Sequence, residues 1–314
     1  MIKKILNSTS QNYFGTIAIG KSYEKNFENN TLEFFKEYCK KNDIGLILIT
    51  KDLLKKNSEY WKKPEWQKLL APKIILDKFK KIKNICMIDT DILINTSSPN
   101  IFKFHKKNTI SAVSIRNFMP YKWDDTTRRI AFLRKKYYFK SYPLDSALNI
   151  STKNLYKYHK LSPQKDEFCA GVYIIPKVYF EKFYEFFFMF KKNIKTITNG
   201  GEQTHFNHFI QKNFKINLLD YRFQAQWVFE MSNYYPFLYS KKYRKNNDLI
   251  SACIDSSLMN NYFLHFAGSW YEGDMWKQKR KKNFFGYDYN FKFNKYKKIK
   301  LKGIPLGRIV PLKK

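Results

Sequence analysis

Hydrophobic positions in the first hundred residues follow two spacings that alternate along the chain. Continuous apolar runs at residues 13–19 and 44–50 are rich in β-branched side chains and short enough for buried strands. Between them, residues 23–40 carry apolar side chains at the spacing of one face of a helix. A second helical stretch at 69–81 leads into the apolar run 84–88. Strands that alternate with helices in this way predict an α/β fold whose sheet has helices on both faces.

Beyond residue 103 the pattern becomes mixed. Strands are expected at 109–115 and 171–175, a polar and basic helix at 126–138, and an aromatic helix at 183–190. The last stretch is mostly Lys, Asn, Phe and Tyr with little periodicity. We therefore expect one α/β domain over residues 1–276, with halves at 13–103 and 104–276, followed by a basic appendage at 277–314.

The composition confirms a folded chain but adds a strong positive charge. Hydrophobic residues make up 44% of the 314 residues, which excludes a disordered protein. Lys and Arg number 59 against 26 Asp and Glu, a formal net charge of +33. Such a charge attracts nucleic acid, acidic lipid or phosphorylated substrates. Because the lysines are spread along the whole chain, the charge alone does not choose among these partners.

Cysteine spacing and hydropathy further narrow the class of protein to which the chain can belong. The four cysteines lie far apart without a C-x-x-C pair, which excludes a zinc ribbon and makes disulfides unexpected. We find no apolar run of the ~18 residues that a membrane span requires, and no apolar signal-peptide core near the start. The expected location is cytoplasmic, with peripheral contact to an anionic membrane as a further possibility.

Candidate chemistry appears where the predicted strand 84–88 ends. Asp89 and Asp91 follow that strand directly, separated by Thr90, so both carboxylates are expected at the carboxyl edge of the sheet, where α/β proteins bind ligands. Carboxylate oxygens suit Mg²⁺ or Mn²⁺. An acidic triplet alone is a weak signal, since such triplets also cap helices and line solvated turns.

Three further segments give this triplet a context. In chain order the sequence carries Phe168-Cys169-Ala170-Gly171-Val172, then Asn199-Gly200-Gly201-Glu202-Gln203, then His265-Phe266-Ala267-Gly268. With Asp89-Thr90-Asp91, this order resembles the family 8 glycosyltransferases, the group of glycogenin and the bacterial lipopolysaccharide galactosyltransferases. The resemblance implies a GT-A fold, a Rossmann-like mixed sheet with helices on both faces. It also implies a retaining enzyme that uses a UDP-sugar and Mn²⁺, or Mg²⁺ in its place.

The resemblance assigns roles to particular residues. His265 completes a metal site with Asp89 and Asp91. Glu202 and Gln203 line the far side of the sugar, where they would stabilise positive charge at the anomeric carbon. Residues 13–103 become the nucleotide-sugar half and 104–276 the acceptor half. Donor contacts are implied for Thr16, Ile17, Tyr23, Lys73, Asp89, Thr90, Asp91 and Gly268.

The sequence departs from the family pattern at three positions. Cys169 replaces an Asn, Glu202 replaces an Asp, and Tyr271 stands where a Lys after the H-F-x-G segment holds the diphosphate. A replacement cation is expected from the loop that follows, which carries Lys277, Lys279 and Arg280.

We therefore expect a transferase that moves a hexose from a nucleotide sugar to a glycan, glycolipid or protein acceptor. The main alternative is a non-enzymatic nucleic-acid-binding protein, favoured by the charge and the interleaved aromatic residues. It leaves Asp89, Asp91 and His265 without a role, so no nucleic-acid partner is expected. A metal-dependent phosphatase or nuclease ranks third because it would need more ligands. A purely structural, buried role for His265 is the alternative at that position.

Overall fold

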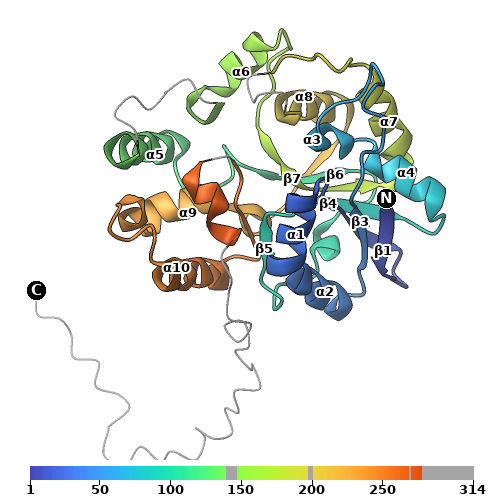
Figure 1. Ribbon diagram of the computed structural model, residues 1–314. Helices are drawn as coiled ribbons and strands as arrows, with labels where there is room; N and C mark the ends of the chain where they lie inside the picture. The colour runs from blue at the N-terminus through green and yellow to red at the C-terminus, as the bar shows by residue number, and fades with distance from the viewer. Residues whose placement is uncertain (139–146, 197–200, 269, 278–314) are drawn as a thin grey trace, which may run out of the picture. The chain divides into compact units, whose positions relative to one another are not determined.

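The computed structural model describes residues 1–138, 147–196, 201–268 and 270–277 (Figure 1). The chain divides into one compact unit of residues 1–279 and a second of residues 280–314. The second unit lies outside the described residues, as does the predicted basic appendage after Lys277. None of the described helices is long and apolar enough to cross a membrane.

A seven-stranded mixed sheet forms the centre of the first unit, in the order β1-β3-β2-β4-β7-β6-β8. Strands β3, β2 and β4 run parallel, whereas β7 is antiparallel to both of its neighbours and β1 is antiparallel to β3. The fold is therefore α/β with a mixed sheet, as predicted. The strands are β1 (Ile2–Leu6), β2 (Asn12–Ile17), β3 (Gly45–Ile49), β4 (Asn84–Ile88), β6 (Ile110–Ser114), β7 (Phe168–Pro176) and β8 (Ile216–Leu218).

One face of this sheet packs against an aromatic layer of helices. The helices on this face are α3 (Pro64–Gln67), α4 (Ala71–Lys78), α7 (Phe180–Phe188) and α8 (Gln203–Asn213). Their buried side chains include Trp66, Phe183 and Phe206, which join strand residues such as Tyr173 in one core. The aromatic run 183–190, which was predicted as a buried helix, is helical through Phe188 and packs in the core.

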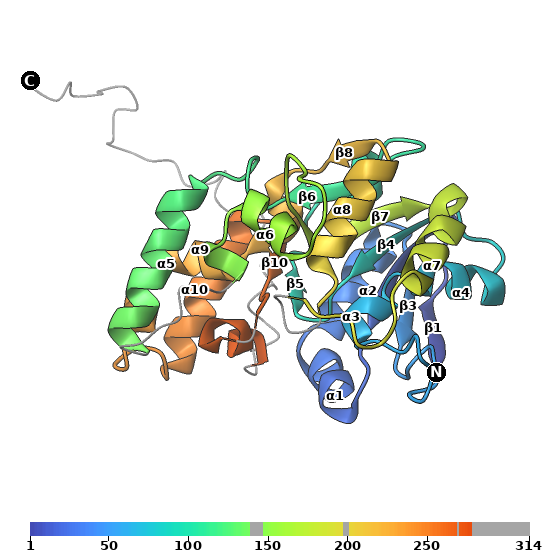
Figure 2. The ribbon, with the colours of Figure 1, turned by 90° about the horizontal axis from the view of Figure 1, so that it is seen from above.

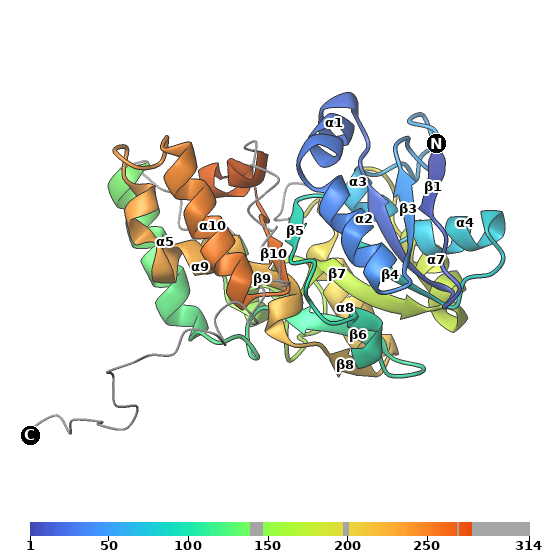
Figure 3. The ribbon, with the colours of Figure 1, turned by 90° about the horizontal axis from the view of Figure 1, so that it is seen from below.

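Helix α2 (Leu32–Lys41) lies over the opposite face (Figure 3), and α1 (Lys21–Asn30) precedes it in the chain. Phe14 of β2 stacks on Tyr38 of α2 and meets Phe35 edge-on. The single helix predicted over 23–40 is wrong, because Thr31 interrupts it with φ −128° and ψ −27°. The Thr31 hydroxyl donates to the carbonyl oxygen of Thr90 at 3.0 Å. The interruption therefore ties the helical layer to the loop that carries the two aspartates.

A second, smaller sheet lies beside the first and consists of β5 (Ile92–Ile94), β10 (Phe263–His265) and β9 (Ala225–Gln226). Beyond it, α5 (Trp123–Tyr137), α9 (Trp227–Tyr234) and α10 (Asn247–Asn260) form a helical layer away from the main sheet (Figures 2 and 3). Helix α6 (Thr152–Tyr158) lies near α8. The described residues also form six short 3-10 helices, η1 (Ile101–Phe104), η2 (Ala147–Asn149), η3 (Lys177–Tyr179), η4 (Tyr221–Gln224), η5 (Pro236–Tyr239) and η6 (Tyr271–Lys277).

Most strands predicted from the apolar runs are confirmed within a few residues, but β1 was not predicted. Its sequence, IKKIL, interrupts the apolar positions with two lysines, and its strand conformation depends on antiparallel pairing with β3. All four cysteines are buried and free.

Candidate metal centre

Backbone hydrogen bonds within the main sheet and within the smaller sheet place the acidic triplet. Strand β4 ends at Ile88, and the Asp89 N–H donates to the Gly171 carbonyl of β7 at 2.9 Å. Two residues on, the Asp91 carbonyl accepts from the Phe266 N–H at 3.0 Å, which extends the antiparallel pairing of β5 with β10. Asp91 and His265 are thereby held side by side, although 174 positions separate them in the chain (265 − 91).

Asp89, Asp91 and His265 come together as a cluster whose ligand atoms all lie within 4.8 Å of one another. His265 Nε2 is 3.4 Å from Asp91 Oδ1 and 3.8 Å from Asp89 Oδ2. The two carboxylates are partly exposed, whereas the imidazole is buried. Two carboxylate oxygens and one imidazole nitrogen form a donor set that suits Mn²⁺ and is also acceptable to Mg²⁺.

The other side of the His265 ring faces protein groups that fix its orientation. The N–H groups of Gly171 and Val172 require the Gln224 carboxamide oxygen to face them, and that oxygen also accepts from His265 Nδ1 at 3.2 Å. Cys169 Sγ lies 3.5 Å from the same nitrogen. A hydrogen on Nδ1 leaves the Nε2 lone pair directed at the carboxylates, as a metal-binding histidine requires.

Charge at the cluster follows from burial and close contact. Burial alone would lower the pKa of His265, but Cys169 and Asp91 overcome this effect and raise that pKa well above its usual range. Burial would likewise raise the pKa of Asp91, and the contact with His265 lowers it instead. A bound cation would take the place of the imidazole proton between these two groups.

Gly171 allows His265 to approach β7 closely. A Cβ atom at this position would lie only 2.8 Å from His265 Nδ1, closer than van der Waals contact permits. The glycine of the predicted F-C-A-G-V strand thus leaves room for the imidazole, because it has no side chain. The resemblance implied this segment, but the reason for its glycine is visible only in the fold.

Lys68 is the lysine that contacts Asp89 among the described residues. Its Nζ lies 2.9 Å from Asp89 Oδ1, 3.2 Å from Glu202 Oε1 and 2.9 Å from the Ala170 carbonyl oxygen. Burial would lower the pKa of Lys68, but Asp89 and Glu202 raise it well above its ordinary value. Lys68 is therefore a charged, buried partner of two carboxylates.

Lys73, which was predicted to contact the donor, has its ion-pair partners on α4 and α7. Lys73 lies on α4 and pairs with Asp77 one turn further along, at 2.7 Å, and with Glu181 of α7 at 3.7 Å. Both partners are exposed on the surface of the helical layer. The spacing from the acidic triplet selected Lys73, but the turn at α3 brings Lys68 to Asp89 instead.

Glu202 and Gln203 lie at the start of α8, facing the strand β7. Burial raises the pKa of the Glu202 carboxyl even though Lys68 opposes the shift. Gln203 Nε2 donates to Glu167 Oε1 at 2.8 Å, and the other Glu167 oxygen pairs with Arg116. The guanidinium of Arg116 lies 4.0 Å from the centre of the Trp123 ring. A continuous buried chain of polar groups therefore holds Gln203.

The predicted donor-binding residues occupy different environments. Thr16 is buried, and its hydroxyl has no hydrogen-bond partner among the described residues. Ile17 is partly buried and pairs with Ile49 of β3. Tyr23 on α1 is 63% exposed, which leaves its ring available to a ligand. Thr90 is buried in the loop between the aspartates.

The segment after β10 turns sharply at Gly268, whose φ of +99° suits only glycine without strain. Tyr271 begins η6, where the guanidinium of Arg244 lies 5.5 Å from its ring centre. Lys277 at the end of η6 pairs with the exposed Asp274 at 2.5 Å. Lys279 and Arg280, the other two expected cations, lie outside the described residues.

Ionised groups around the candidate centre leave an excess of negative charge. Asp89, Asp91 and Glu202 contribute three carboxylates against one ammonium group, that of Lys68, so two negative charges remain when His265 is neutral. A divalent cation would balance this charge. The donor set and its charge therefore fit a divalent metal ion.

Sequence reasoning missed Lys68 and Gln224. Lys68 directly precedes the apolar run Leu69-Leu70-Ala71, so a charged residue at the start of an apolar run was a usable signal. Gln224 had no such signal, because its contact with His265 depends on the parallel pairing of β9 with β10.

Neither a protein-family model nor a curated protein sequence matches this chain. Several solved structures are similar. A glycosyltransferase involved in the glycosylation of the major capsid of PBCV-1 shares 10% identity, with a TM-score of 0.49 over 85% of this chain and 98% of that one. The bifunctional glycosyltransferase WbbM shares 11% identity, with a TM-score of 0.47 over 84% of this chain and 46% of its own length. The galactosyltransferase LgtC, solved with donor and acceptor sugar analogues, shares 11% identity, with a TM-score of 0.41 over 82% of this chain and 87% of that one.

Proposed function

We propose that this protein is a metal-dependent glycosyltransferase that moves a hexose from a nucleotide sugar, with a UDP-sugar favoured, to a glycan, glycolipid or protein acceptor. The observation that carries the proposal is the convergence of Asp89, Asp91 and His265, with ligand atoms within 4.8 Å of one another, directly after a parallel strand of the main sheet. Ligands of α/β proteins bind at this edge. The motif order of the family 8 glycosyltransferases supplies the class of donor.

Asp89, Asp91 and His265 would hold Mn²⁺ or Mg²⁺. The bound cation would supply Lewis-acid stabilisation of the diphosphate leaving group. Gln224 and Cys169 keep the His265 ring turned toward the carboxylates, and the hydrogen bond from Thr31 to Thr90 holds the loop between them. These contacts set the ligands in place before any donor arrives, which reduces the cost of binding.

Lys68, Glu202 and Gln203 form the part of the site nearest to β7. In the proposed reaction Glu202 and Gln203 lie beside the transferred sugar, where a carboxylate and an amide oxygen would stabilise positive charge at the anomeric carbon. Lys68 forms ion pairs with Asp89 and Glu202 and so offsets part of their negative charge. The resemblance implies a reaction that retains the anomeric configuration. In such a reaction the protein would position the reacting groups and balance their charge.

Thr16, Ile17 and Tyr23 would receive the nucleoside. The buried Thr16 hydroxyl, which has no partner among the described residues, offers a donor and an acceptor to a base, and the exposed Tyr23 ring offers a stacking face. Gly268 would let the backbone approach the diphosphate, because glycine has no side chain to interfere.

The test is hydrolysis of a panel of nucleotide sugars by the purified chain, with and without Mn²⁺, in the absence of acceptor. We expect turnover of one donor, loss of that turnover on chelation, and a fall of at least about a hundredfold in Asp91→Asn. Asp77→Asn makes the same chemical change at an exposed position that pairs with Lys73, and it should keep wild-type turnover.

Absence of turnover together with absence of metal-dependent nucleotide-sugar binding would contradict the proposal. Salt-dependent binding of single-stranded nucleic acid by such an inactive chain would then favour the nucleic-acid-binding alternative.

A further inference from the structure

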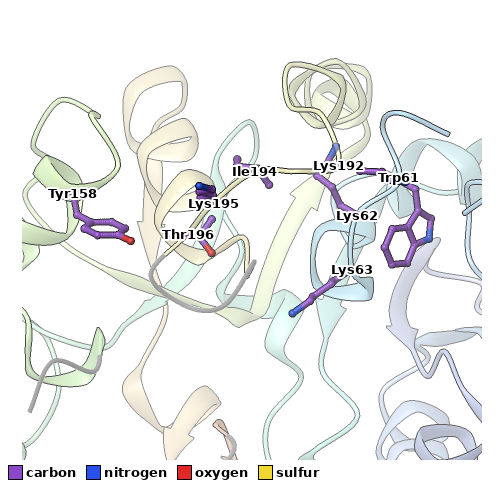
Figure 4. A pocket seen from close by; sticks show the side chains of 8 residues that line it. All are labelled: Trp61, Lys62, Lys63, Tyr158, Lys192, Ile194, Lys195 and Thr196. Carbon is purple, nitrogen blue, oxygen red and sulfur yellow. The ribbon is translucent and has the colours of Figure 1, made fainter. Parts of the chain in front are cut away.

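A separate cavity of about 460 Å³ opens between α3, α6 and the segment that follows α7. Small-molecule sites commonly enclose roughly 300–1,000 Å³. Half of its lining residues are lysines and none is acidic. We call it the lysine pocket, and it is lined by Trp61, Lys62, Lys63, Tyr158, Lys192, Ile194, Lys195 and Thr196 (Figure 4).

In the lysine pocket, Lys62 differs from Lys192 and Lys195 in its burial. Lys62 is buried, and its Nζ donates to the carbonyl oxygens of Tyr60 at 3.0 Å and Phe187 at 3.1 Å. Burial lowers the pKa of Lys62 to about 8. Lys192 and Lys195 are exposed and form no ion pair with a described acidic residue. The ammonium groups of Lys192 and Lys195 are thus available to a bound anion, whereas Lys62 forms part of the pocket wall.

Aromatic rings stand at both ends of the lysine pocket, with the lysines between them (Figure 4). The Trp61 ring is held by a hydrogen bond from its Nε1 to Asp52 Oδ1 at 3.1 Å. The Tyr158 ring is 60% exposed, so a face of it is open to solvent. Flat aromatic faces pack against the apolar faces of sugar rings, and lysines bind anionic substituents as point charges.

Two segments that line the lysine pocket continue into the candidate metal centre. Lys63 precedes Lys68 by five residues, a length of chain that spans at most about 18 Å. Thr196 precedes Glu202 by six residues, and Lys68 and Glu202 form an ion pair at 3.2 Å. These two segments therefore connect the lysine pocket to the side of the site where Glu202 and Gln203 would face the transferred sugar.

We propose that the lysine pocket binds the negatively charged part of the acceptor, so that the acceptor is a saccharide carrying phosphate or carboxylate groups. The anion lies against Lys192 and Lys195, and the sugar ring lies against Trp61 or Tyr158. The role as acceptor site rests on the proposed transferase activity. The binding of an anionic sugar does not.

The experiment is calorimetric titration of the full chain, already saturated with UDP and Mn²⁺, with glucose 6-phosphate, glucuronate and glucose. Both anionic sugars are expected to bind, and glucose at least about tenfold more weakly, because it lacks the charge that the lysines recognise. Lys192→Ala/Lys195→Ala should weaken the anionic sugars by about tenfold. The control Lys106→Ala/Lys107→Ala removes the same charge from an exposed loop elsewhere and should change their affinity by less than about twofold.

Three outcomes would overturn the lysine pocket as an anion site: equal binding of glucose and the anionic sugars, wild-type affinity in Lys192→Ala/Lys195→Ala, or failure of the anionic sugars to bind the UDP-saturated chain. Donor hydrolysis without acceptor, measured on the same proteins, separates this inference from the proposed function. Both double variants should hydrolyse the donor at the wild-type rate, since neither alters the metal centre. A wild-type chain that binds anionic sugars but hydrolyses no donor would overturn the acceptor role.

Discussion

Gly171 and His265 touch across the two sheets, because β7 presents a residue without a side chain where the imidazole edge arrives from β10. A Cβ atom on residue 171 would lie 2.8 Å from His265 Nδ1. The lack of a side chain at residue 171 therefore leaves room for His265, the third ligand of the candidate metal centre. A larger residue at this position should displace the imidazole.

Gly171→Ala is expected to displace His265 and to weaken Mn²⁺ binding. The added methyl group should also lower the free energy of unfolding by about 1–3 kcal/mol, the usual range for an overpacked core. Both quantities can be measured by urea unfolding with and without Mn²⁺. In a His265→Ala background the same substitution should cost less, since the opposing ring is gone, and an equal cost in both backgrounds would refute the stated cause.

Mn²⁺ alone should stabilise the protein, because the folded chain presents three ligands that the unfolded chain does not hold together. At a free concentration of a hundred times the dissociation constant, the gain is about 2.7 kcal/mol. Thermal unfolding at rising Mn²⁺ concentrations measures it. Asp91→Asn and His265→Gln should lose most of the shift, whereas Asp77→Asn should keep it. An undiminished shift in Asp91→Asn would place the bound metal elsewhere.

Lys68→Met should destabilise the fold because it leaves Asp89 and Glu202 without their shared cation. Removing one partner of a buried ion pair commonly costs about 3–5 kcal/mol. In the double variant Lys68→Met/Glu202→Gln one of the two orphaned charges is gone, so part of the loss should be recovered. Urea unfolding at neutral pH provides the comparison.

Lys73→Met serves as the control for Lys68, since Lys73 is more exposed and its partners lie on the surface. Its unfolding midpoint should stay close to that of the wild type. A loss in Lys73→Met as large as that in Lys68→Met would show that the assignment of Lys68 to the site is mistaken.

We expect the buried His205 to lower the free energy of unfolding as the pH falls from 6.5 toward 4. Burial lowers its pKa to about 4, and the neighbouring His159 and His208 act in the same direction. The folded state thus holds His205 neutral, whereas the unfolded chain takes up a proton near pH 6.5. The stability that the neutral His205 contributes is fully present above pH 6.5 and is lost as the pH falls toward 4. At pH 5 the loss amounts to roughly 2 kcal/mol.

Unfolding of the wild type and of His205→Phe at pH 8 and pH 5 tests this pH dependence. The ring environment of Trp66 and Phe190 accepts an apolar replacement, so the variant should fold. The wild type should lose about 2 kcal/mol more than the variant between the two pH values. Parallel losses in both proteins would assign the acid sensitivity to other groups.

The local pattern of the sequence determined which segments are strands and helices near the site. Period and run length identify β2, β3 and β4, and they place Asp89 and Asp91 directly after a buried strand, because a strand end is a local event. The order of the short motifs also pointed to His265 as the third member of the set. These features depend on neighbours in sequence, so they can be read from the chain.

The tertiary structure decided the contacts that complete the site. The pairing of β5 with β10 brings Asp91 to His265, and the turn at α3 selects Lys68 over Lys73 although both lysines stand upstream of the acidic triplet. Register between distant strands and the direction in which a helical side chain points depend on packing across the whole core. Those choices are made by segments far apart in sequence, and no local pattern contains them.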